Sequence, residues 1–237
     1  MATTATALDC ASLCEQSYCD QMMDAQGFRK CPAPHVDVFA RSEGSTLLLV
    51  FRGTDSAEDW RTDFQIQQIP LPWSGDRAVR VHYGFLKYYN AVRNWIHRAI
   101  EEAIPRRVLL ASHSLGSGVA TLCAHDLATK YASLPIRSVT FGSPRVGNYG
   151  FAAAFENATI KSFRFADPED VIPTVPYANY KHVPGKIICT EEGWSHPQTV
   201  EGKISCCHLL CACPSVRDHT MRNYVESLTA GEECIVE

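Results

Sequence analysis

The chain has 237 residues, of which 46% are hydrophobic and 20% charged, and this is enough apolar material to bury one large core. Its formal net charge of -4, without any run of like charges, excludes a basic patch for nucleic acid. The longest apolar runs fall short of the roughly 18 residues that a membrane-spanning helix needs. We therefore expect one domain over residues 1–237, with no nucleic-acid partner and no transmembrane segment.

The eleven cysteines gather mainly near the two ends of the chain. The first cluster comprises Cys10, Cys14, Cys19 and Cys31, the second comprises Cys206, Cys207, Cys211, Cys213 and Cys234, and Cys123 and Cys189 lie between them. Terminal clusters are typical of disulfides that tie down chain ends in an exported protein, and an odd total leaves at least one thiol unpaired in a monomer. Cys123 is the expected free thiol, because it falls on an apolar helix face.

These cysteines predict a secreted protein, although residues 1–10 lack the basic and apolar regions of a signal peptide. A signal would then have been removed before this numbering begins. The alternatives are reduced thiols in a cytoplasmic protein, a metal site within 206–213, and lipidation of that segment. Because the segment contains no pair of CxxC arms, we expect no metal ion.

The first third of the chain predicts a helix followed by a hairpin. Residues 8–24 mix small, polar and apolar residues in a way that favours a modest helix covering a sheet. Residues 35–40 alternate and residues 46–51 are continuously apolar, which predicts two strands joined by a turn at 41–44.

A candidate lid follows the second strand. Gly53 lets the backbone turn over the sheet edge, and the amide of Thr54 is then a candidate hydrogen-bond donor to an oxyanion. Taken alone, the Gly53-Thr54 dipeptide indicates only a turn. The next segment, about 56–76, is too long for an ordinary connection and mixes tryptophans with charges and prolines. We expect a short amphipathic helix at 57–65 that lies across a pocket as a lid. The alternative is a surface loop that packs its tryptophans.

Helices and strands alternate through the rest of the chain. The pattern predicts a long helix at 84–103, strands at 108–111, 136–141 and 161–165, short helices at 151–155 and 221–228, and a helix after 116 whose apolar face includes Cys123. Such alternation indicates an α/β fold with a mostly parallel central sheet, helices on both faces, and functional sites beyond the carboxyl ends of the strands.

The joint between the strand at 108–111 and the following helix reads SHSLG at 112–116. A turn this sharp needs small residues two before and two after its centre, and it exposes Ser114 above the sheet. This is the nucleophile elbow pattern with its first glycine changed to serine. The amide of Leu115, at the positive end of a helix, points to where negative charge would develop on a carbonyl oxygen. The pentapeptide alone is weak evidence for a catalytic serine, but its place between a predicted strand and a predicted helix supports that interpretation.

Several motifs in one order resemble a known family. They are FRGT at 51–54, Trp60, VHYGFL at 81–86, HSLG at 113–116, FGSPRVGN at 141–148, and Asp170 with Pro173. Over roughly residues 35–225 the chain is similar to the class three (fungal-type triacylglycerol) lipases, which have the α/β-hydrolase fold. The resemblance implies a Ser-Asp-His triad, an oxyanion hole made by the Thr54 and Leu115 amides, a lid after Thr54, and chemistry without a metal or cofactor.

The triad order in this fold is Ser, then Asp or Glu, then His. The resemblance assigns the acid to Asp170, which precedes an apolar-proline turn, and leaves Asp167 as a turn residue before Pro168. It assigns the base to His219, which precedes the last helix, with His208 as the alternative.

These residues predict a serine carboxylic ester hydrolase, most simply a monomeric lipase acting on acylglycerols or related lipid esters through an acyl-enzyme. The alternatives are a phospholipase A1, a feruloyl-type esterase, a cytosolic acyltransferase, and a catalytically silent secreted lipid-binding protein. Ser112 and Ser117 depart from the family's usual glycines, and both are small enough to keep the turn. The lid candidate is unusually charged, which favours a more soluble or more polar ester.

Overall fold

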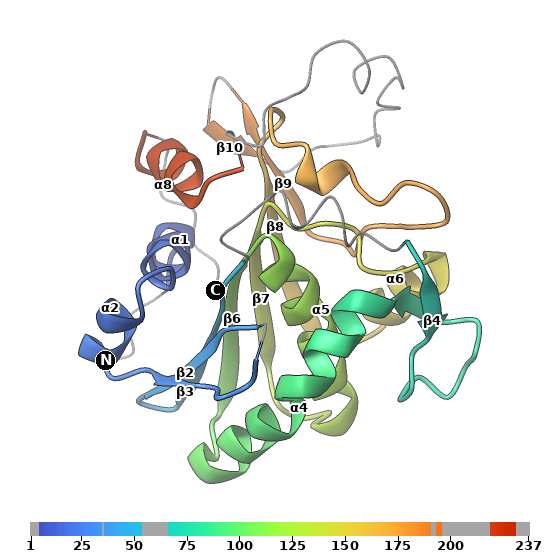
Figure 1. Cartoon of the computed structure of the whole chain (residues 1–237), viewed down its shortest axis with the longest axis horizontal. Coiled ribbons are helices and arrows are strands. Elements are labelled where there is room, and N and C mark those ends of the chain that lie inside the picture. The colour runs from blue at the N-terminus through green and yellow to red at the C-terminus, as the bar shows by residue number, and fades with distance from the viewer. Residues whose placement is uncertain (1–4, 35, 54–65, 191–192, 196–218, 231–237) are drawn as a thin grey trace.

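The computed structural model describes residues 5–34, 36–53, 66–190, 193–195 and 219–230 (Figure 1). In this part of the chain, eight strands form one sheet in the order β1-β2-β3-β6-β7-β8-β9-β10. They are β1 (Arg29–Lys30), β2 (Val38–Glu43), β3 (Thr46–Phe51), β6 (Arg107–His113), β7 (Ile136–Phe141), β8 (Ile160–Ala166), β9 (Lys186–Thr190) and β10 (Gly193–Ser195). The pairs from β3 to β9 are parallel, and the remaining pairs at the two edges are antiparallel. The prediction of a mostly parallel sheet is confirmed.

Helices cover both faces of this sheet, as predicted. They are α1 (Ala7–Gln16), α2 (Asp20–Ala25), α4 (Tyr83–Ala103), α5 (Leu115–Lys130), α6 (Tyr149–Glu156) and α8 (Met221–Ala230), with a 3-10 turn η1 (Ile172–Thr174). Figure 1 shows α1, α2 and α8 on one side of the sheet and α4, α5 and α6 on the other. None of the helices described is both long and apolar enough to cross a bilayer.

Two apolar cores sandwich the sheet, because successive side chains of a strand point to opposite faces. In β3, Leu47 and Leu49 enter the core beneath α4 and α5, whereas Leu48 and Val50 enter the core beneath α1 and α8. The same alternation occurs in β6. Strands that are buried on both faces read as continuous apolar runs, which explains why these two were visible in the sequence.

Some element boundaries differ from the prediction. The helix expected at 8–24 is divided into α1 and α2, because the buried Ser17 hydroxyl donates to the Cys14 carbonyl at 2.6 Å and ends the first helix. The hairpin turn lies after Glu43 rather than at 41–44, and Gly44 adopts a φ of +56° there. The strands β1, β4, β5, β9 and β10 were not predicted, and all of these except β9 have only two or three residues, which is too short to show a periodicity.

The second half of the expected lid belongs to a small sheet. The strand β4 (Gln68–Pro70) pairs antiparallel with β5 (Arg80–His82), and Leu71 next to it is buried. Trp73 packs against the same core, and its indole N–H donates to His125 Nδ1 at 3.1 Å. These contacts tie residues 68–73 to the body of the protein. The helix expected at 57–65 lies outside the described residues.

The cysteines of the first cluster do not form disulfides with one another. Cys10, Cys14, Cys19 and Cys31 carry free thiols, as does Cys123, which was the predicted unpaired cysteine. Cys10 and Cys14 lie one turn apart on α1, where Cβ atoms are about 5–6 Å apart and too distant for a bridge. Cys31 is buried in the core on the other face of the sheet. Burial raises the pKa of Cys10 to about 12, so this thiol stays protonated.

A buried carboxylate joins α4 to α5. Asp126 is 1% exposed and accepts hydrogen bonds from the Tyr89 hydroxyl at 2.6 Å, from Arg93 through two nitrogens at 2.8 Å, and from His97 Nε2 at 2.9 Å. Burial alone would raise the pKa of Asp126, but these donors together hold it well below its usual value. Asp126 is therefore charged, and its charge is compensated by groups on the neighbouring helix.

We predict that Asp126→Ala lowers the free energy of unfolding by about 2–4 kcal/mol, because Arg93, Tyr89 and His97 lose their shared acceptor. Urea denaturation near neutral pH measures this loss. The folded pKa of Asp126 is depressed, so its contribution is present above the unfolded value of about 3.9 and is lost as the pH falls. The difference between the two proteins should therefore shrink in acid.

Glu101→Ala is the matched control. Its exposed carboxylate pairs with Lys130 at 3.4 Å across the same two helices, and the loss of such a pair changes stability by no more than about 0.5 kcal/mol. Equal losses in the two variants would contradict the role given to the buried network.

Candidate active site

Ser114 lies in the turn between β6 and α5 and has an unusual backbone conformation. Its φ of 57° and ψ of -130° fall where residues with a side chain are rarely found, at a cost of about 1–3 kcal/mol. The Ser114 amide donates to the Phe141 carbonyl of β7 at 3.0 Å, which anchors the turn to the neighbouring strand. The predicted elbow is therefore present, with the serine at its tip.

Two glycines bring the end of β3 beside this turn. A Cβ added to Gly116 would lie 2.5 Å from the Phe51 carbonyl oxygen and 2.6 Å from that of Arg52. A Cβ added to Gly53 would lie 2.9 Å from Ser114 Cβ. Any side chain at these positions would push the strand end away from the serine, so the close approach requires both glycines.

The two serines that replace the family's usual glycines are accommodated by hydrogen bonds. Ser112 and Ser117 are completely buried, and their hydroxyls donate to the Val139 and Phe141 carbonyls of β7, each at 3.4 Å. A buried hydroxyl with a partner costs little, and the turn therefore tolerates both residues.

The acid and the base predicted from the sequence lie in contact. His219, just before α8, donates from Nδ1 to Asp170 Oδ2 at 2.7 Å, and both side chains are buried, at 8% and 2% exposure. The other carboxylate oxygen of Asp170 accepts from the Ile172 amide at 2.8 Å. His219 Nε2 has no hydrogen-bond partner among the described residues and so is available to a further group.

Asp167, the alternative acid, has a different role. Its carboxylate accepts from the Glu169 amide at 2.9 Å, and its carbonyl accepts from the Asp170 amide at 3.2 Å. It therefore shapes the turn that presents Asp170. The alternative base, His208, lies outside the described residues.

Tyr224 was not identified from the sequence, although it contacts the same carboxylate. Its hydroxyl donates to Asp170 Oδ2 at 2.7 Å, and the side chain is completely buried on α8. Burial first, and then the adjacent carboxylate, raise the pKa of Tyr224 well above its usual value, so the hydroxyl keeps its proton. The helical spacing of Met221, Tyr224 and Leu228 in the C-terminal segment was a signal of burial, but it did not distinguish a core tyrosine from a donor to the acid.

Gly142, which follows β7, provides the space for the acid and the base. Its φ is +58°, and an added Cβ would lie 2.6 Å from His219 Cε1 and 2.7 Å from Asp170 Oδ2. Both the backbone conformation and the lack of a side chain are therefore required here. This accounts for the first glycine of the FGSPRVGN motif.

The remainder of that motif braces the loop that carries Asp170. The Arg145 amide donates to the Val175 carbonyl at 2.9 Å, and the Arg145 side chain donates to the carbonyls of Thr174 and Pro176. Asn148 caps α6 by accepting from the Phe151 amide at 2.9 Å. The conspicuous motif is thus mainly structural.

One of the two predicted oxyanion donors lies within the described residues. Leu115 is the first residue of α5, where backbone amides have no carbonyl partner within the helix. Its amide follows Ser114 directly, as the prediction requires. Thr54 lies outside the described residues, but the structure does place the preceding Gly53 next to Ser114.

The other described histidines have structural partners. His82 caps α4 by accepting from the Phe85 amide at 3.3 Å, and burial lowers its pKa to about 4. His97 contacts Asp126, His125 contacts Trp73, and His182 lies 2.6 Å from the Pro173 carbonyl oxygen. The described residues contain no group of three or more His, Cys, Asp and Glu side chains that could hold a metal ion.

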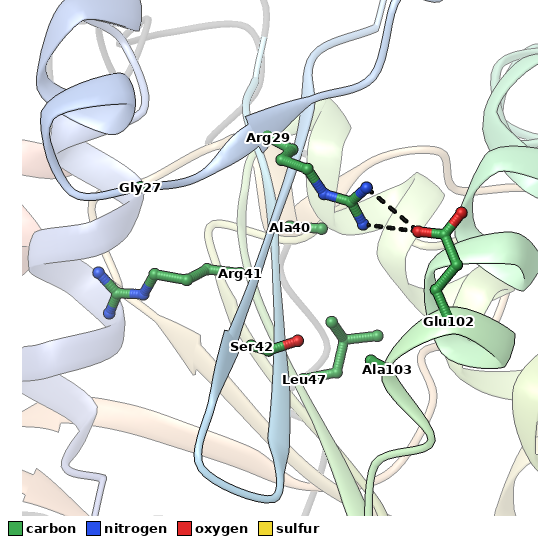
Figure 2. Close-up of a pocket in the computed structure, with 8 residues that line it drawn as sticks. All are labelled: Gly27, Arg29, Ala40, Arg41, Ser42, Leu47, Glu102 and Ala103. Atoms are coloured by element: carbon green, nitrogen blue, oxygen red, sulfur yellow. Dashed lines mark hydrogen bonds and ion pairs between the residues drawn. The ribbon is translucent and has the colours of Figure 1, made fainter.

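A surface hollow of about 340 Å³ lies at the opposite end of the sheet (Figure 2). Gly27, Arg29, Ala40, Arg41, Ser42, Leu47, Glu102 and Ala103 line it. Figure 2 shows Arg29 reaching across to Glu102, with which it forms hydrogen bonds of 3.1 Å, while Arg41 points away. Because Leu47 is near the amino end of β3, the hollow is remote from Ser114 and does not belong to this site.

Comparisons with known proteins relate the chain to a family of enzymes. Residues 48–180 match the family model described as Lipase (class 3). A lipase of Rhizomucor miehei is 30% identical over 190 residues, which cover 73% of this chain and 51% of that protein. A chloroplastic phospholipase A1 of Arabidopsis thaliana is 30% identical over 149 residues, which cover 55% of this chain and 33% of that protein.

The solved structure of lipase II from Rhizopus niveus has a TM-score of 0.74 to this chain at 23% identity. The match covers 91% of this chain and 94% of that one, and it confirms the predicted α/β-hydrolase fold. The chain spans about half the length of the curated lipases that it matches.

For the ester hydrolysis that the sequence predicts, we expect Tyr224→Phe to lower kcat by about tenfold and to leave KM nearly unchanged, because Asp170 loses one of its hydrogen-bond donors. Steady-state kinetics on a soluble p-nitrophenyl ester measure both constants. Tyr149→Phe, which removes a hydroxyl from a side chain that is 67% exposed, serves as the control. If the two variants had equal kcat values, Tyr224 would be only a packing residue.

Proposed function

The chain belongs to the class 3 lipase family, and from this membership we propose that it is a serine ester hydrolase acting on lipid esters. One observation carries the proposal. Ser114 lies at the tip of a strained strand-to-helix turn, and the Asp170–His219 pair lies at the same edge of the sheet. No other described histidine contacts an acid beyond the carboxyl ends of the parallel strands.

We assign the triad to Ser114, Asp170 and His219. As the Ser114 hydroxyl oxygen forms a bond to the substrate's carbonyl carbon, its proton passes to His219 Nε2, and the electron pair of the C=O π bond moves to the carbonyl oxygen. The amides of Leu115 and Thr54 donate to this oxyanion. Asp170 holds the His219 tautomer in which Nδ1 carries the proton and Nε2 accepts one.

The acyl-enzyme then forms when the tetrahedral intermediate collapses. His219 returns its proton to the departing alcohol, and the C–O bond to that alcohol breaks. Water attacks the acyl-enzyme while giving a proton to His219, and the same proton returns to Ser114 Oγ as the free acid leaves. Both half-reactions therefore use one base and one oxyanion hole.

We propose acylglycerols as the main substrate class, because the family model is that of lipases and a lipase is among the most similar relatives. A second candidate activity is phospholipase A1, which is supported by the 30% identity to a plant enzyme of that name. Both activities cleave a carboxylic ester with the same residues, and they differ in the headgroup that the site must admit.

The lid remains part of the proposal. We place it in residues 56–65, because residues 68–73 are tied to the body by β4 and by Trp73. The charges in this segment favour esters more polar than long-chain triacylglycerols.

We predict that Ser114→Ala reduces ester hydrolysis by about 10⁴-fold or more without a loss of folding. Wild type and variant are compared on short- and long-chain p-nitrophenyl esters, on a triacylglycerol emulsion and on phosphatidylcholine. A fluorophosphonate probe should label wild type and not the variant. Release of fatty acid from phosphatidylcholine alone would establish the phospholipase candidate in place of the lipase.

A wild-type protein that is folded, inactive on every ester and unlabelled by the probe would contradict the proposal. It would favour the silent lipid-binding protein instead. Ser112→Ala is the matched control, since it removes a hydroxyl two residues away that donates to a backbone carbonyl.

We also propose that the protein is exported and that cysteines of the second cluster pair with one another. The free thiols of Cys10, Cys14, Cys19, Cys31 and Cys123 leave pairing to the remaining cysteines. Thiol titration of the unfolded, unreduced protein should count fewer than the eleven thiols that the reduced protein contains. A count of eleven would instead favour a cytoplasmic protein.

A further inference from the structure

Tyr18 brings the N-terminal segment into the candidate site. It follows α1, outside residues 48–180 that match the family model, and no motif singled it out. Its hydroxyl shares a 2.7 Å hydrogen bond with His113 Nδ1. The same hydroxyl would lie 2.6 Å from a Cβ added to Gly53, so it fills the space that the glycine leaves beside Ser114.

His113, the residue before Ser114, connects Tyr18 to the proposed base. Its ring stacks on that of His219, with the centroids 4.6 Å apart and the planes inclined by 26°. The exposed fraction of His113 is 4% and that of His219 is 8%, so water does not separate the rings. Burial, and then the proximity of His219, lower the pKa of His113 well below its usual value. His113 is therefore neutral while His219 works.

This stack has a consequence for proton transfer. In the proposed mechanism His219 becomes an imidazolium as Ser114 gives up its proton. The face of a neutral aromatic ring attracts a cation, whereas a second protonated ring at the same distance would repel it. A neutral ring at 4.6 Å thus avoids this repulsion and restricts the rotation of the His219 imidazole.

We propose that His113 and Tyr18 are positioning residues for the base. The neutral His113 ring, held by the Tyr18 hydroxyl, sets the plane of the His219 imidazole during acyl transfer. This inference rests on the proposed triad and adds to it a ring stacked on the face of the imidazole that Asp170 holds at its edge.

Other groups around the stack are compatible with this role. Among the described residues, His219 contacts Asp170 from the loop after β8 and His113 from β6, and Tyr224 from α8 contacts both of these partners. Arg52, at the end of β3, lies over the Tyr18 ring at 5.8 Å and is paired with Asp37 at 2.5 Å. The arginine charge is thereby compensated by a carboxylate.

The experiment compares His113→Leu with His113→Phe. Leucine removes the aromatic face, whereas phenylalanine keeps it and loses only the ring nitrogens. We expect His113→Leu to lower kcat by about tenfold with little change in KM, because the His219 imidazole loses the ring that fixes its plane. His113→Phe should recover most of the rate.

Tyr18→Phe tests the hydrogen bond to His113. On its own it leaves His113 Nδ1 buried without that partner, and we expect kcat to fall severalfold. Combined with His113→Phe, where position 113 has no nitrogen to satisfy, the same change should cost much less. Thermal unfolding of each variant shows whether it is folded. If Tyr18→Phe alone is unstable, the kcat of the double variant is compared with that of His113→Phe instead.

Specific results would overturn the inference. They are equal kcat values for the folded leucine and phenylalanine variants, or additive losses of kcat in the double variant. Ser114→Ala, measured in parallel, keeps the two proposals apart. If its activity vanishes while the His113 variants behave like wild type, the triad stands and only the positioning role fails.

Discussion

The positive φ of Ser114 is the constraint on which the site depends. A non-glycine residue holds such a conformation only when its surroundings leave no alternative. Gly53, Gly116 and Gly142 each stand where an added Cβ would meet a neighbour at 2.9 Å or less. Side chains are therefore missing at three positions beside Ser114 and the Asp170–His219 pair, and the ends of β3, β6 and β7 can approach one another.

Local patterns were enough to predict the central part of this arrangement. The continuous apolar run of β6 followed by the small residues of the elbow identified Ser114, and β3, α4 and β7 were likewise visible as periodic segments. Tyr18 and Tyr224 could not be recognised in this way, because their roles arise from contacts with His113 and Asp170, which lie 95 and 54 residues away in the sequence. The N-terminal cysteines are close in the sequence, and their clustering suggested disulfides. In the structure, the helical spacing of Cys10 and Cys14 and the position of Cys31 on the other face of the sheet keep these thiols apart.

The two buried carboxylates of the described residues illustrate how partners decide a role. Asp126 is held by a bidentate arginine together with a histidine and a tyrosine, so its charge is neutralised and serves to join two helices. Asp170 receives a phenol and a backbone amide, both uncharged, along with His219. Because no arginine is bonded to it in the described structure, its charge is left to act on the imidazole. The same residue type thus gives stability on one face of the sheet and can orient a base at its edge.

The packing of α1 against α8 has a consequence for how the molecule comes apart. Both helices cover one face of the sheet (Figure 1). The segment after α1 supplies Tyr18, and the segment before α8 supplies His219, whereas the parallel strands and α5 form an interior that does not need either end. Elements that pack on the outside of a fold open at a lower free energy than its core strands. Local opening of α1 or α8 would therefore separate the stacked rings of His113 and His219 while most of the sheet stayed folded, so the activity proposed for this site would be lost before global unfolding.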